Sequence, residues 1–311
     1  MKFTLVAVLS LLSCSSSFLV PSPGLPPPPP SSSSSLLATV GVVGATGAVG
    51  KEIIGVLENR NFPVDELRIF GSERSAGSKV VTKFGDVNVE LFNIDSASKC
   101  DVVFLAVSGE FALKNAVELS KSSYVIDNSS AFRYDDDVPL CVPEINAHKI
   151  KGRKLIANPN CTTAIGLMAV SPLMKLFGMK RLIMSTYQAS SGAGQPGMDE
   201  LKEGTRAVIN GELKVAKNEV FAHPLPFNVI PHIDSFQENG YTKEEMKVTW
   251  ETRKICGLPS DFPASCTAVR IPTIRAHSES IVIETERDVD VGLARKAMQD
   301  APGVRLVDDI R

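Results

Sequence analysis

Apolar residues occur along this chain in short runs that alternate with stretches of helical periodicity. The run at residues 38–43 is continuous, and a helical pattern follows it to about residue 57. Further short runs occur at residues 67–71, 101–107 and 124–127. Continuous apolar runs of this length are typical of strands buried on both faces of a parallel sheet. The first half of the chain is therefore predicted to be an α/β domain with a parallel sheet.

The hydrophobic pattern changes after residue 160. An apolar helical run covers residues 164–170, and residues 181–189 form a longer strand-like segment with partial alternation, which is typical of a mixed or antiparallel sheet. Residues 241–251 have a clear helical pattern with Thr242 as the N-cap. We therefore predict two domains, at residues 36–160 and 161–311, and the second is α+β with a mixed sheet.

Residues 1–35 are predicted to be a leader that is not part of either domain. Lys2 precedes an apolar run at residues 3–12, which is too short to span a bilayer, and small residues follow. Five consecutive prolines and five consecutive serines come next, and no acidic residue occurs before Glu52. This layout resembles the bipartite plastid-targeting leader of algae with complex plastids. We therefore expect the plastid stroma as the location, with plain secretion as the alternative.

Charge and cysteine content exclude several classes of partner. The 311 residues include 33 Lys and Arg against 35 Asp and Glu, so the balance does not favour nucleic acid or an anionic membrane as a partner of the mature protein. The cysteines and the four histidines are scattered, without C-x-x-C or another metal-ligand spacing. We expect neither a metal site nor a disulfide framework.

A glycine-rich turn follows the first predicted strand. Its sequence is G-A-T-G-A-V-G at residues 44–50, and glycines at such a junction allow a backbone to approach a pyrophosphate at a helix N-terminus. The spacing differs from the usual G-x-G-x-x-G, and a merely tight turn is the alternative. In this strand–turn–helix context we predict a Rossmann-type dinucleotide site, with contacts from Gly44, Thr46, Gly47, Ala48, Val49 and Gly50.

The end of the second predicted strand indicates which dinucleotide binds. An arginine at this position suits the 2′-phosphate of NADP, whereas a carboxylate suits the ribose of NAD. Arg74, with the hydroxyls of Ser72 and Ser75, therefore predicts NADP(H) as the cofactor. Glu73 argues for the other choice, and a polar surface turn without a binding role is the third possibility.

The candidate nucleophile is Cys161, which stands between a Pro/Asn turn and an apolar helical run. Asn160 or Thr162 can cap that helix by accepting its free N–H groups. The positive end of the helix dipole favours the thiolate form of a cysteine at this place. A small buried apolar cysteine is the alternative.

Several motifs together resemble aspartate-semialdehyde dehydrogenases, across residues 38–311. N-P-N-C-T-T and the seven-residue step from Arg270 to His277 are the most specific of them. The other motifs are G-A-T-G-A-V-G, S-E-R-S-A-G, N-S-S-A-F-R, Q-A-S-S-G-A-G, F-N-V-I-P-H-I-D, E-E-M-K and V-R-I-P-T-I-R-A-H-S-E. The resemblance implies NADPH-dependent reductive dephosphorylation of L-4-aspartyl phosphate to aspartate semialdehyde, within the synthesis of lysine, threonine, methionine and isoleucine.

The resemblance also implies the roles of individual residues. Cys161 would form a thioester, His277 would act as acid and base with a near-neutral pKa, and Gln188 would orient the acyl group. The other residues that it implicates are Arg133 and Lys247 for phosphate, Arg270 for the α-carboxylate, Glu244 for the ammonium group, Asn160 for substrate, and Ser191 and Gly192 for the cofactor.

One departure and three alternatives accompany this resemblance. The family normally continues past Arg311 into strands and a helix that return to the first domain. Either the sequence is truncated here, or the protein lacks part of its first domain, in which case we expect poor affinity for NADP. N-acetyl-glutamyl-phosphate reductase and glyceraldehyde-3-phosphate dehydrogenase share related chemistry, but their cysteine motif or its surroundings differ from N-P-N-C-T-T. A non-catalytic homologue that keeps a dimer surface is the third alternative. The family implies a homodimer or homotetramer, with residues 161–311 as the catalytic and dimerisation domain.

Overall fold

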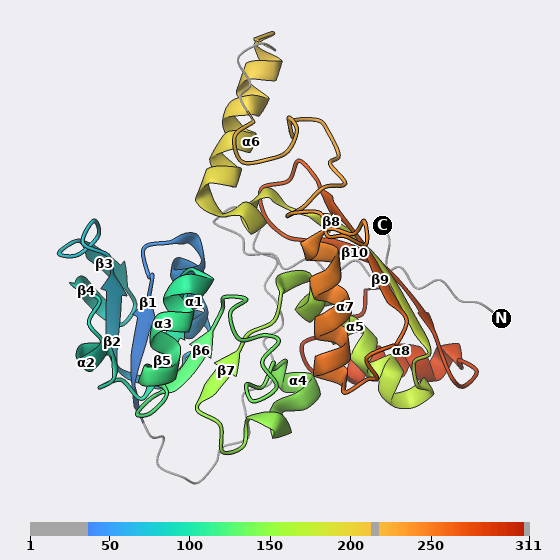
Figure 1. The fold of residues 1–311 in the computed structure, drawn as a ribbon, viewed down its shortest axis with the longest axis horizontal. Helices are drawn as coiled ribbons and strands as arrows, with labels where there is room; N and C mark the ends of the chain where they lie inside the picture. The colour runs from blue at the N-terminus through green and yellow to red at the C-terminus, as the bar shows by residue number, and fades with distance from the viewer. Residues whose placement is uncertain (1–36, 213–217, 308–311) are drawn as a thin grey trace.

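The computed structural model describes residues 37–212 and 218–307, which form two bodies side by side (Figure 1). The predicted leader at residues 1–35 lies outside the described residues. Each body contains one sheet, of seven strands in the first and three in the second. The predicted fold class is confirmed, with a mostly parallel Rossmann-type sheet in the first body and a mixed sheet in the second.

The seven-stranded sheet has the order β3-β4-β2-β1-β5-β6-β7, and its strands are parallel except for β3. The chain runs from β1 to one side of the sheet and later returns to the other side at β5. Ligands bind at such a switch point in open α/β sheets. The strands are β1 (Ala38–Val43), β2 (Val64–Gly71), β3 (Lys79–Thr82), β4 (Gly85–Leu91), β5 (Val102–Leu105), β6 (Tyr124–Asp127) and β7 (Leu155–Ala157).

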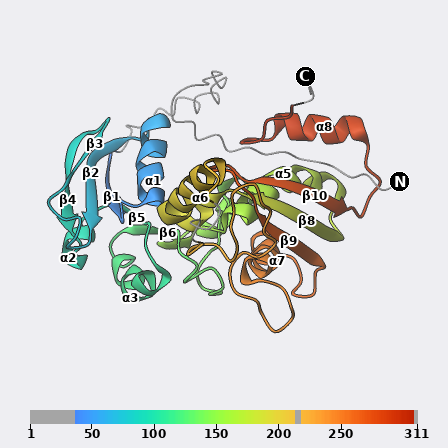
Figure 2. The same ribbon diagram turned by 90° about the horizontal axis from the view of Figure 1, so that it is seen from above.

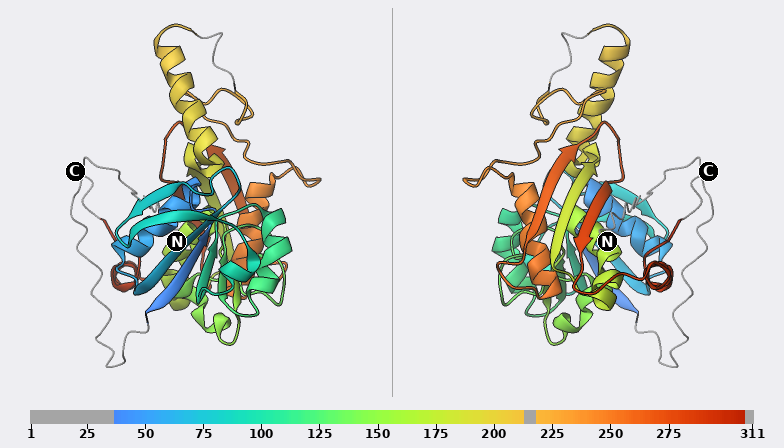
Figure 3. Two further views of the ribbon diagram at one scale, coloured as in Figure 1. Left: turned by 90° about the vertical axis from the view of Figure 1, so that its left-hand side faces the viewer. Right: turned by 90° about the vertical axis from the view of Figure 1, so that its right-hand side faces the viewer.

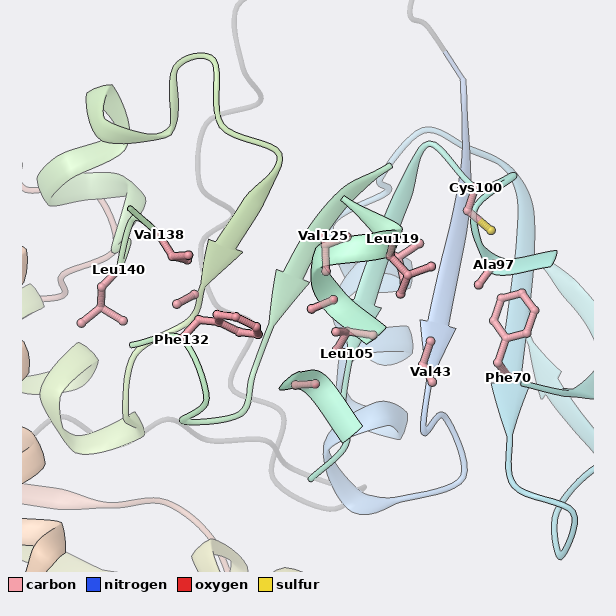
Figure 4. Packing of buried hydrophobic residues seen from close by; sticks show 14 of the residues in the cluster. Val43, Phe70, Ala97, Cys100, Leu105, Leu119, Val125, Phe132, Val138 and Leu140 are labelled. Carbon is pink, nitrogen blue, oxygen red and sulfur yellow. The ribbon is translucent and has the colours of Figure 1, made fainter. Parts of the chain in front are cut away.

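Helices cover both faces of this sheet, which is why its strands are apolar on both sides. Val40 and Val42 of β1 point to the face that α1 (Ala48–Asn59) covers, and Val43 points to the opposite face. On that opposite face Phe70, Leu105 and Leu119 belong to a buried cluster that also includes Phe132 and Leu140 (Figure 4). The remaining helices of the first body are α2 (Ile94–Ala97), α3 (Gly109–Leu119) and α4 (Pro143–Asn146), with a 3₁₀ turn at Ala147–Ile150.

The three-stranded sheet has the order β10-β8-β9, where β8 is antiparallel to β10 and parallel to β9. Figure 2 shows the three strands beside α5 and α7. The buried face of the sheet packs on these helices through an apolar cluster that includes Leu182, Met184, Val248 and Ile281. The elements are α5 (Cys161–Phe177), β8 (Arg181–Gln188), a 3₁₀ turn at Ser190–Ala193, α6 (Gly194–Ile209), α7 (Lys243–Cys256), β9 (Ala264–Arg270), β10 (Ser278–Glu284) and α8 (Val291–Asp300).

No helix among the described residues covers the other face of the three-stranded sheet. The right-hand view of Figure 3 looks onto these strands without a helix in front of them. Along β8 buried and more exposed residues alternate, and the exposed ones include Ile183 and Tyr187, each at 43% exposure. None of the helices in the described part of the chain has the length and hydropathy that a membrane crossing requires.

Candidate active site

The turn between β1 and α1 has the geometry of a phosphate cradle. Gly44 has φ +83, and a Cβ atom there would lie 2.3 Å from the carbonyl oxygen of Ala106 at the end of β5. A Cβ at Gly50 would lie 2.3 Å from the carbonyl oxygen of Gly44. Only glycine fits both positions, because a substituent would meet backbone. Gly47 is the N-cap of α1 and has no side chain to satisfy the first N–H groups of the helix, which favours an anion there.

The predicted NADP-selective residues lie beside that turn. Strands β1 and β2 are adjacent and parallel, so the turn after β2 lies beside Gly44 at the C-terminal ends of the strands. Ser72 and Arg74 are exposed, whereas Ser75 is half-buried and bonds to the carbonyl of Ser72. The structure therefore brings the predicted cofactor residues at 44–50 and 72–75 together at the C-terminal ends of the strands, near the switch point of the sheet.

Asn160 fixes the start of α5. Its side-chain oxygen accepts hydrogen bonds from the backbone N–H groups of Thr162, at 3.0 Å, and Thr163, at 3.3 Å. Of the two predicted caps, Asn160 is the one that the structure contains. Cys161 therefore occupies the first position of the helix, and it is exposed.

Cys161 opens into a cavity of about 580 Å³ between the two bodies. The segment after β6, the N-terminus of α5, the end of β8 and one face of α7 contribute to its walls. The predicted residues that line it are Arg133, Asn160, Cys161, Gln188, Gly192, Glu244, Lys247 and Arg270. Residues that the sequence did not indicate as site residues also line it, among them Ser130, Phe221, His232 and Asp234.

The helix N-terminus favours the thiolate of Cys161, as expected, but in this arrangement its effect is outweighed and the thiol is not ionised at neutral pH. The pKa of Cys161 is raised to about 12. The main cause is desolvation of the sulfur by the surrounding protein, and the second is the negative charge of Glu244. The N–H of Thr162 and the cation of Arg133 act in the opposite direction but are weaker. Activation of this thiol therefore requires a further positive charge or a base close to the sulfur.

Three charged residues form a chain at one end of the cavity. Lys247 donates to Asp234 at 2.8 Å and to Glu244 at 3.0 Å. Burial alone would raise the pKa of Glu244, but Lys247 and hydrogen bonds from Asn160 and Gln188 lower it below its ordinary value. Burial opposes the charge of Lys247, yet both carboxylates raise its pKa. All three groups are therefore charged at neutral pH.

Arg270 is a buried cation without a carboxylate partner among the described residues. Its exposed fraction is 5%, one Nη donates to the carbonyl of Ala189 at 2.6 Å, and the guanidinium lies 5.6 Å from the centre of the Phe221 ring. Burial lowers its pKa from the ordinary value, and Glu244 opposes that shift. A buried guanidinium with most of its N–H groups unused is suited to a carboxylate ligand.

Gln188 is held by two hydrogen bonds. Its amide oxygen accepts from the hydroxyl of Thr186 at 2.9 Å, and its amide nitrogen donates to Glu244 at 3.1 Å. Gln188 and Arg270 are paired residues at the ends of the neighbouring strands β8 and β9. The end of the three-stranded sheet thus places both side chains beside the N-terminus of α5.

His277 lies just before β10 at the same sheet end, but it stands behind Gly192 and does not line the cavity. Its Nδ1 accepts a hydrogen bond from the backbone N–H of Ala189 at 3.0 Å, which places the proton of the neutral ring on Nε2. Burial, and then the cation of Arg270, lower the pKa of His277 to about 4. The expected near-neutral pKa is wrong here.

The lack of a side chain at Gly192 leaves open the space beside Arg270 and His277. A Cβ at this position would lie 3.0 Å from an Nη of Arg270 and 3.6 Å from Nε2 of His277. Ser191 and Gly192 belong to the 3₁₀ turn that leads into α6, and α6 contacts α1 of the first body. The predicted cofactor residues of the second body therefore lie on the side of the cavity that faces the nucleotide domain.

Arg133 is anchored by a residue that the sequence did not indicate. Its Nη1 donates to the buried carboxylate of Glu251 at 3.1 Å, and its other bonds go to the carbonyls of Ser129 and Asn128. Glu251 stands seven positions after Glu244, so both lie on one face of α7. That spacing is the signal that could have indicated Glu251 from the sequence.

Comparison with known proteins identifies the family. Two family models match the chain, "Semialdehyde dehydrogenase, NAD binding domain" at residues 39–153 and "Semialdehyde dehydrogenase, dimerisation domain" at residues 170–311. An aspartate-semialdehyde dehydrogenase of Aquifex aeolicus is 44% identical, over 87% of this chain and 80% of that relative. The chain belongs to the aspartate-semialdehyde dehydrogenase family. The family assignment from the sequence motifs is confirmed.

Other members of the family agree with this assignment. The aspartate-semialdehyde dehydrogenase of Bacillus subtilis is 42% identical, over 87% of this chain and 80% of the relative. A crystal structure of aspartate-semialdehyde dehydrogenase II of Vibrio cholerae, complexed with ASA, superposes with a TM-score of 0.82 at 39% identity and covers 87% of this chain and 81% of that one. The two-domain architecture described above is therefore that of the family.

Proposed function

We propose that this protein reduces L-4-aspartyl phosphate to aspartate semialdehyde, with release of phosphate and oxidation of NADPH. The observation that carries the proposal is the position of Cys161, which starts α5 at the wall of a cavity that also holds Arg133, Lys247 and Arg270. Three cations beside a nucleophile suit a substrate with a carboxylate and a phosphate. The same relatives that establish the family give no support to the N-acetyl-glutamyl-phosphate reductase alternative.

Residues at the switch point of the first sheet fit the cofactor. The turn at Gly44 and Gly50 excludes side chains, and the N-terminus of α1 has N–H groups without a side-chain acceptor, so a pyrophosphate would be held there. Arg74, with Ser72 and Ser75, would hold a 2′-phosphate. When bound, the reduced nicotinamide supplies the hydride that takes the acyl group to the aldehyde level.

Cys161 performs the covalent step in this proposal. Its thiolate attacks the acyl carbonyl of aspartyl phosphate, a carbon–sulfur bond forms, the bond from the acyl carbon to the phosphate oxygen breaks, and phosphate leaves. Its pKa of about 12 makes the thiolate rare at neutral pH. The cation of Arg133 already lowers this pKa, and a deprotonating group must approach the sulfur before attack.

His277 contributes as a hydrogen-bond donor in the observed tautomer. With Nδ1 bonded to the N–H of Ala189, Nε2 carries the proton and faces the space beside Gly192. A donor there stabilises negative charge that develops on a substrate oxygen. To accept a proton through Nε2, the ring must first break its bond to Ala189 and move its own proton to Nδ1. We propose that this exchange accompanies its acid–base work.

Different charged residues of the cavity bind the two ends of the substrate. Arg270, which has no carboxylate partner in the described part of the chain, takes the α-carboxylate, and Glu244 takes the ammonium group. Arg133 and Lys247 take the phosphate. Gln188 and Asn160 both bond to Glu244, so they orient the acyl group relative to this anchor.

The covalent step has a direct test. Purified protein with aspartate semialdehyde, phosphate and NADP should form NADPH, and Cys161→Ala should lower the rate by a factor of about a thousand or more because the nucleophile is gone. Cys256→Ala, a change at the far end of α7, should leave the rate unchanged. With aspartyl phosphate and no reductant, mass spectrometry should find an acyl adduct on Cys161. A folded wild-type protein without turnover or adduct would favour the non-catalytic alternative.

The protein is also proposed to form a homodimer through the uncovered face of the three-stranded sheet. The dimerisation-domain match at residues 170–311 includes this sheet, and oligomerisation follows from the family. Ile183 and Tyr187 give the face an exposed apolar surface in its central strand. Exposed apolar surface of this kind is typical of interaction sites. A homotetramer would need a second contact surface in addition.

The leader is proposed to direct the protein to a plastid. The support is the arrangement of Lys2, the apolar run at residues 3–12 and the acid-free Ser-rich stretch that follows. A fluorescent protein fused behind residues 1–50 should accumulate in the plastid stroma of an alga with complex plastids. Accumulation in the medium would favour plain secretion.

A further inference from the structure

Glu251 is a buried carboxylate that contacts two parts of the proposed site but does not line the cavity. Its side chain is fully shielded from solvent, and that of Arg133 is 9% exposed. One carboxylate oxygen accepts from Nη1 of Arg133 at 3.1 Å, and the other accepts from the backbone N–H of Asn160 at 2.7 Å. A carboxylate with both oxygens bonded in this way connects two segments that come from different parts of the chain.

The first bond restrains the guanidinium of Arg133. Together with the carbonyls of Ser129 and Asn128, Glu251 uses three of the five N–H groups of Arg133. No other residue in the described ranges accepts from the remaining two, and Arg133 lines the cavity. Glu251 therefore holds the guanidinium of Arg133 in an orientation that leaves two N–H groups free to bind an anion.

The second bond restrains the start of α5. Asn160 is held at two places by α7, since its backbone N–H donates to Glu251 and its side-chain amide donates to Glu244 at 3.0 Å. The same Asn160 caps α5 with its side-chain oxygen, one residue before Cys161. The two carboxylates of α7 thus determine where the sulfur enters the cavity.

We propose that Glu251 is a positioning residue that sets the distance between the phosphate-binding arginine, Arg133, and the nucleophile, Cys161. Burial raises the pKa of Glu251, while Arg133 and the N–H of Asn160 oppose that shift. A buried carboxylate is retained at such a place only when charged or polar partners satisfy it. The proposal rests on the function proposed above, because phosphate is one of the ligands that it concerns.

Two variants separate the two bonds. In Glu251→Gln the amide oxygen can still accept from the N–H of Asn160. The amide NH₂ then faces the N–H groups of Arg133, so the bond to Arg133 is lost. The KM of this variant for phosphate should rise about tenfold or more, because the guanidinium of Arg133 loses its carboxylate partner. The KM for aspartate semialdehyde should change less than about threefold. Glu251→Leu removes both bonds, so it should also change the rate at which iodoacetamide alkylates Cys161 by about fivefold or more, read by peptide mass spectrometry.

A neighbouring glutamate is the matched control. Glu245 is also buried on α7, but it bonds to the N–H groups of Thr242 and Ala268, away from the cavity. Glu245→Gln should leave both KM values and the alkylation rate of Cys161 unchanged. Alkylation needs no turnover, so it tests the link to Cys161 even if the proposed reaction fails. A KM for phosphate in Glu251→Gln that is unchanged or lower than in the wild type overturns the proposal. A wild-type alkylation rate in Glu251→Leu also overturns it.

Discussion

Single buried groups in this protein differ from the behaviour that their residue type suggests. The sulfur of Cys161 has a high pKa because the surrounding cavity walls exclude water from it, although the residue as a whole opens into the cavity, and His277 has a low pKa because it is buried beside Arg270. Glu279 is 3% exposed, and neither of its carboxylate oxygens has a hydrogen-bond partner among the described residues. It lies next to Gly166 of α5, where a Cβ would approach Oε2 to 2.7 Å. A buried carboxyl without partners holds its proton.

Glu279 should make the stability of the protein depend on pH. Burial raises its pKa in the folded state to about 8, whereas the ordinary value is 4.5. Between these values the folded state binds one more proton than the unfolded state, so the free energy of unfolding should fall as pH rises from about 4.5 to 8 and then level off. The decrease should be at most about 5 kcal/mol, at about 1.4 kcal/mol for each pH unit of that interval.

Urea unfolding of the wild type and Glu279→Gln at several pH values measures this contribution. The variant has no proton to release at this site, so its stability relative to the wild type should increase steadily between about pH 5 and 8. Asp300→Asn at the exposed end of α8 is the control, and its difference from the wild type should stay constant over that range. A constant difference for Glu279→Gln would mean that Glu279 is already ionised in the folded protein.

Most helices and strands could be predicted from the sequence because their signals are local. The alternation in β8 and the cap at Thr242 of α7 lie within a few residues of the elements that they define. The glycines at residues 44–50 were predicted for the same reason. Glu251 was missed because a lone carboxylate on a helix is usually solvated, and only its seven-residue spacing from Glu244 on α7 could have indicated it. Its burial depends on Arg133, which lies 118 positions away in the sequence.

The pKa values could not be predicted from local pattern either. The helix N-terminus at Cys161 is visible in the sequence, but the crowding around the sulfur and the approach of Glu244 come from the packing of α7 against α5. The same holds for His277, whose neighbour Arg270 belongs to another strand. The sequence therefore predicts which residues meet in the site but not the charges that result.

The turn after β2 should decide which dinucleotide the protein prefers. Arg74 and Glu73 are neighbouring exposed residues there, and they favour opposite choices. Arg74→Ala should weaken NADPH binding by about tenfold or more with little effect on NADH, since a cation beside the 2′-phosphate is lost. Glu73→Ala is the control variant and should not weaken NADPH binding. Titration of the purified protein with both cofactors by fluorescence measures these affinities, and equal losses for both in Arg74→Ala would show that Arg74 does not contact the 2′-phosphate.

At the scale of the whole molecule, the proposed site depends on contact between the two bodies. Arg133 comes from the segment after β6 of the first sheet, whereas Glu251 and Lys247 come from α7 of the second body. An ion pair between Glu52 of α1 and Arg275 adds a second link. The outer face of the three-stranded sheet takes no part in these contacts (Figure 3).

The oligomeric state should depend on that face. In a twofold symmetric contact each substituted residue occurs twice, so one charge on the central strand β8 places two like charges in the interface. Tyr187→Asp, and equally Ile183→Asp, should therefore convert the oligomer to a smaller species, measured as a lower mass by sedimentation or light scattering at matched concentration. Val81→Asp is the control, because Val81 is an even more exposed apolar strand residue, at 79%, but lies on β3 of the other sheet. An unchanged mass for both β8 variants would place the dimer contact on another surface, whereas dissociation by Val81→Asp as well would indicate that any added charge disrupts assembly.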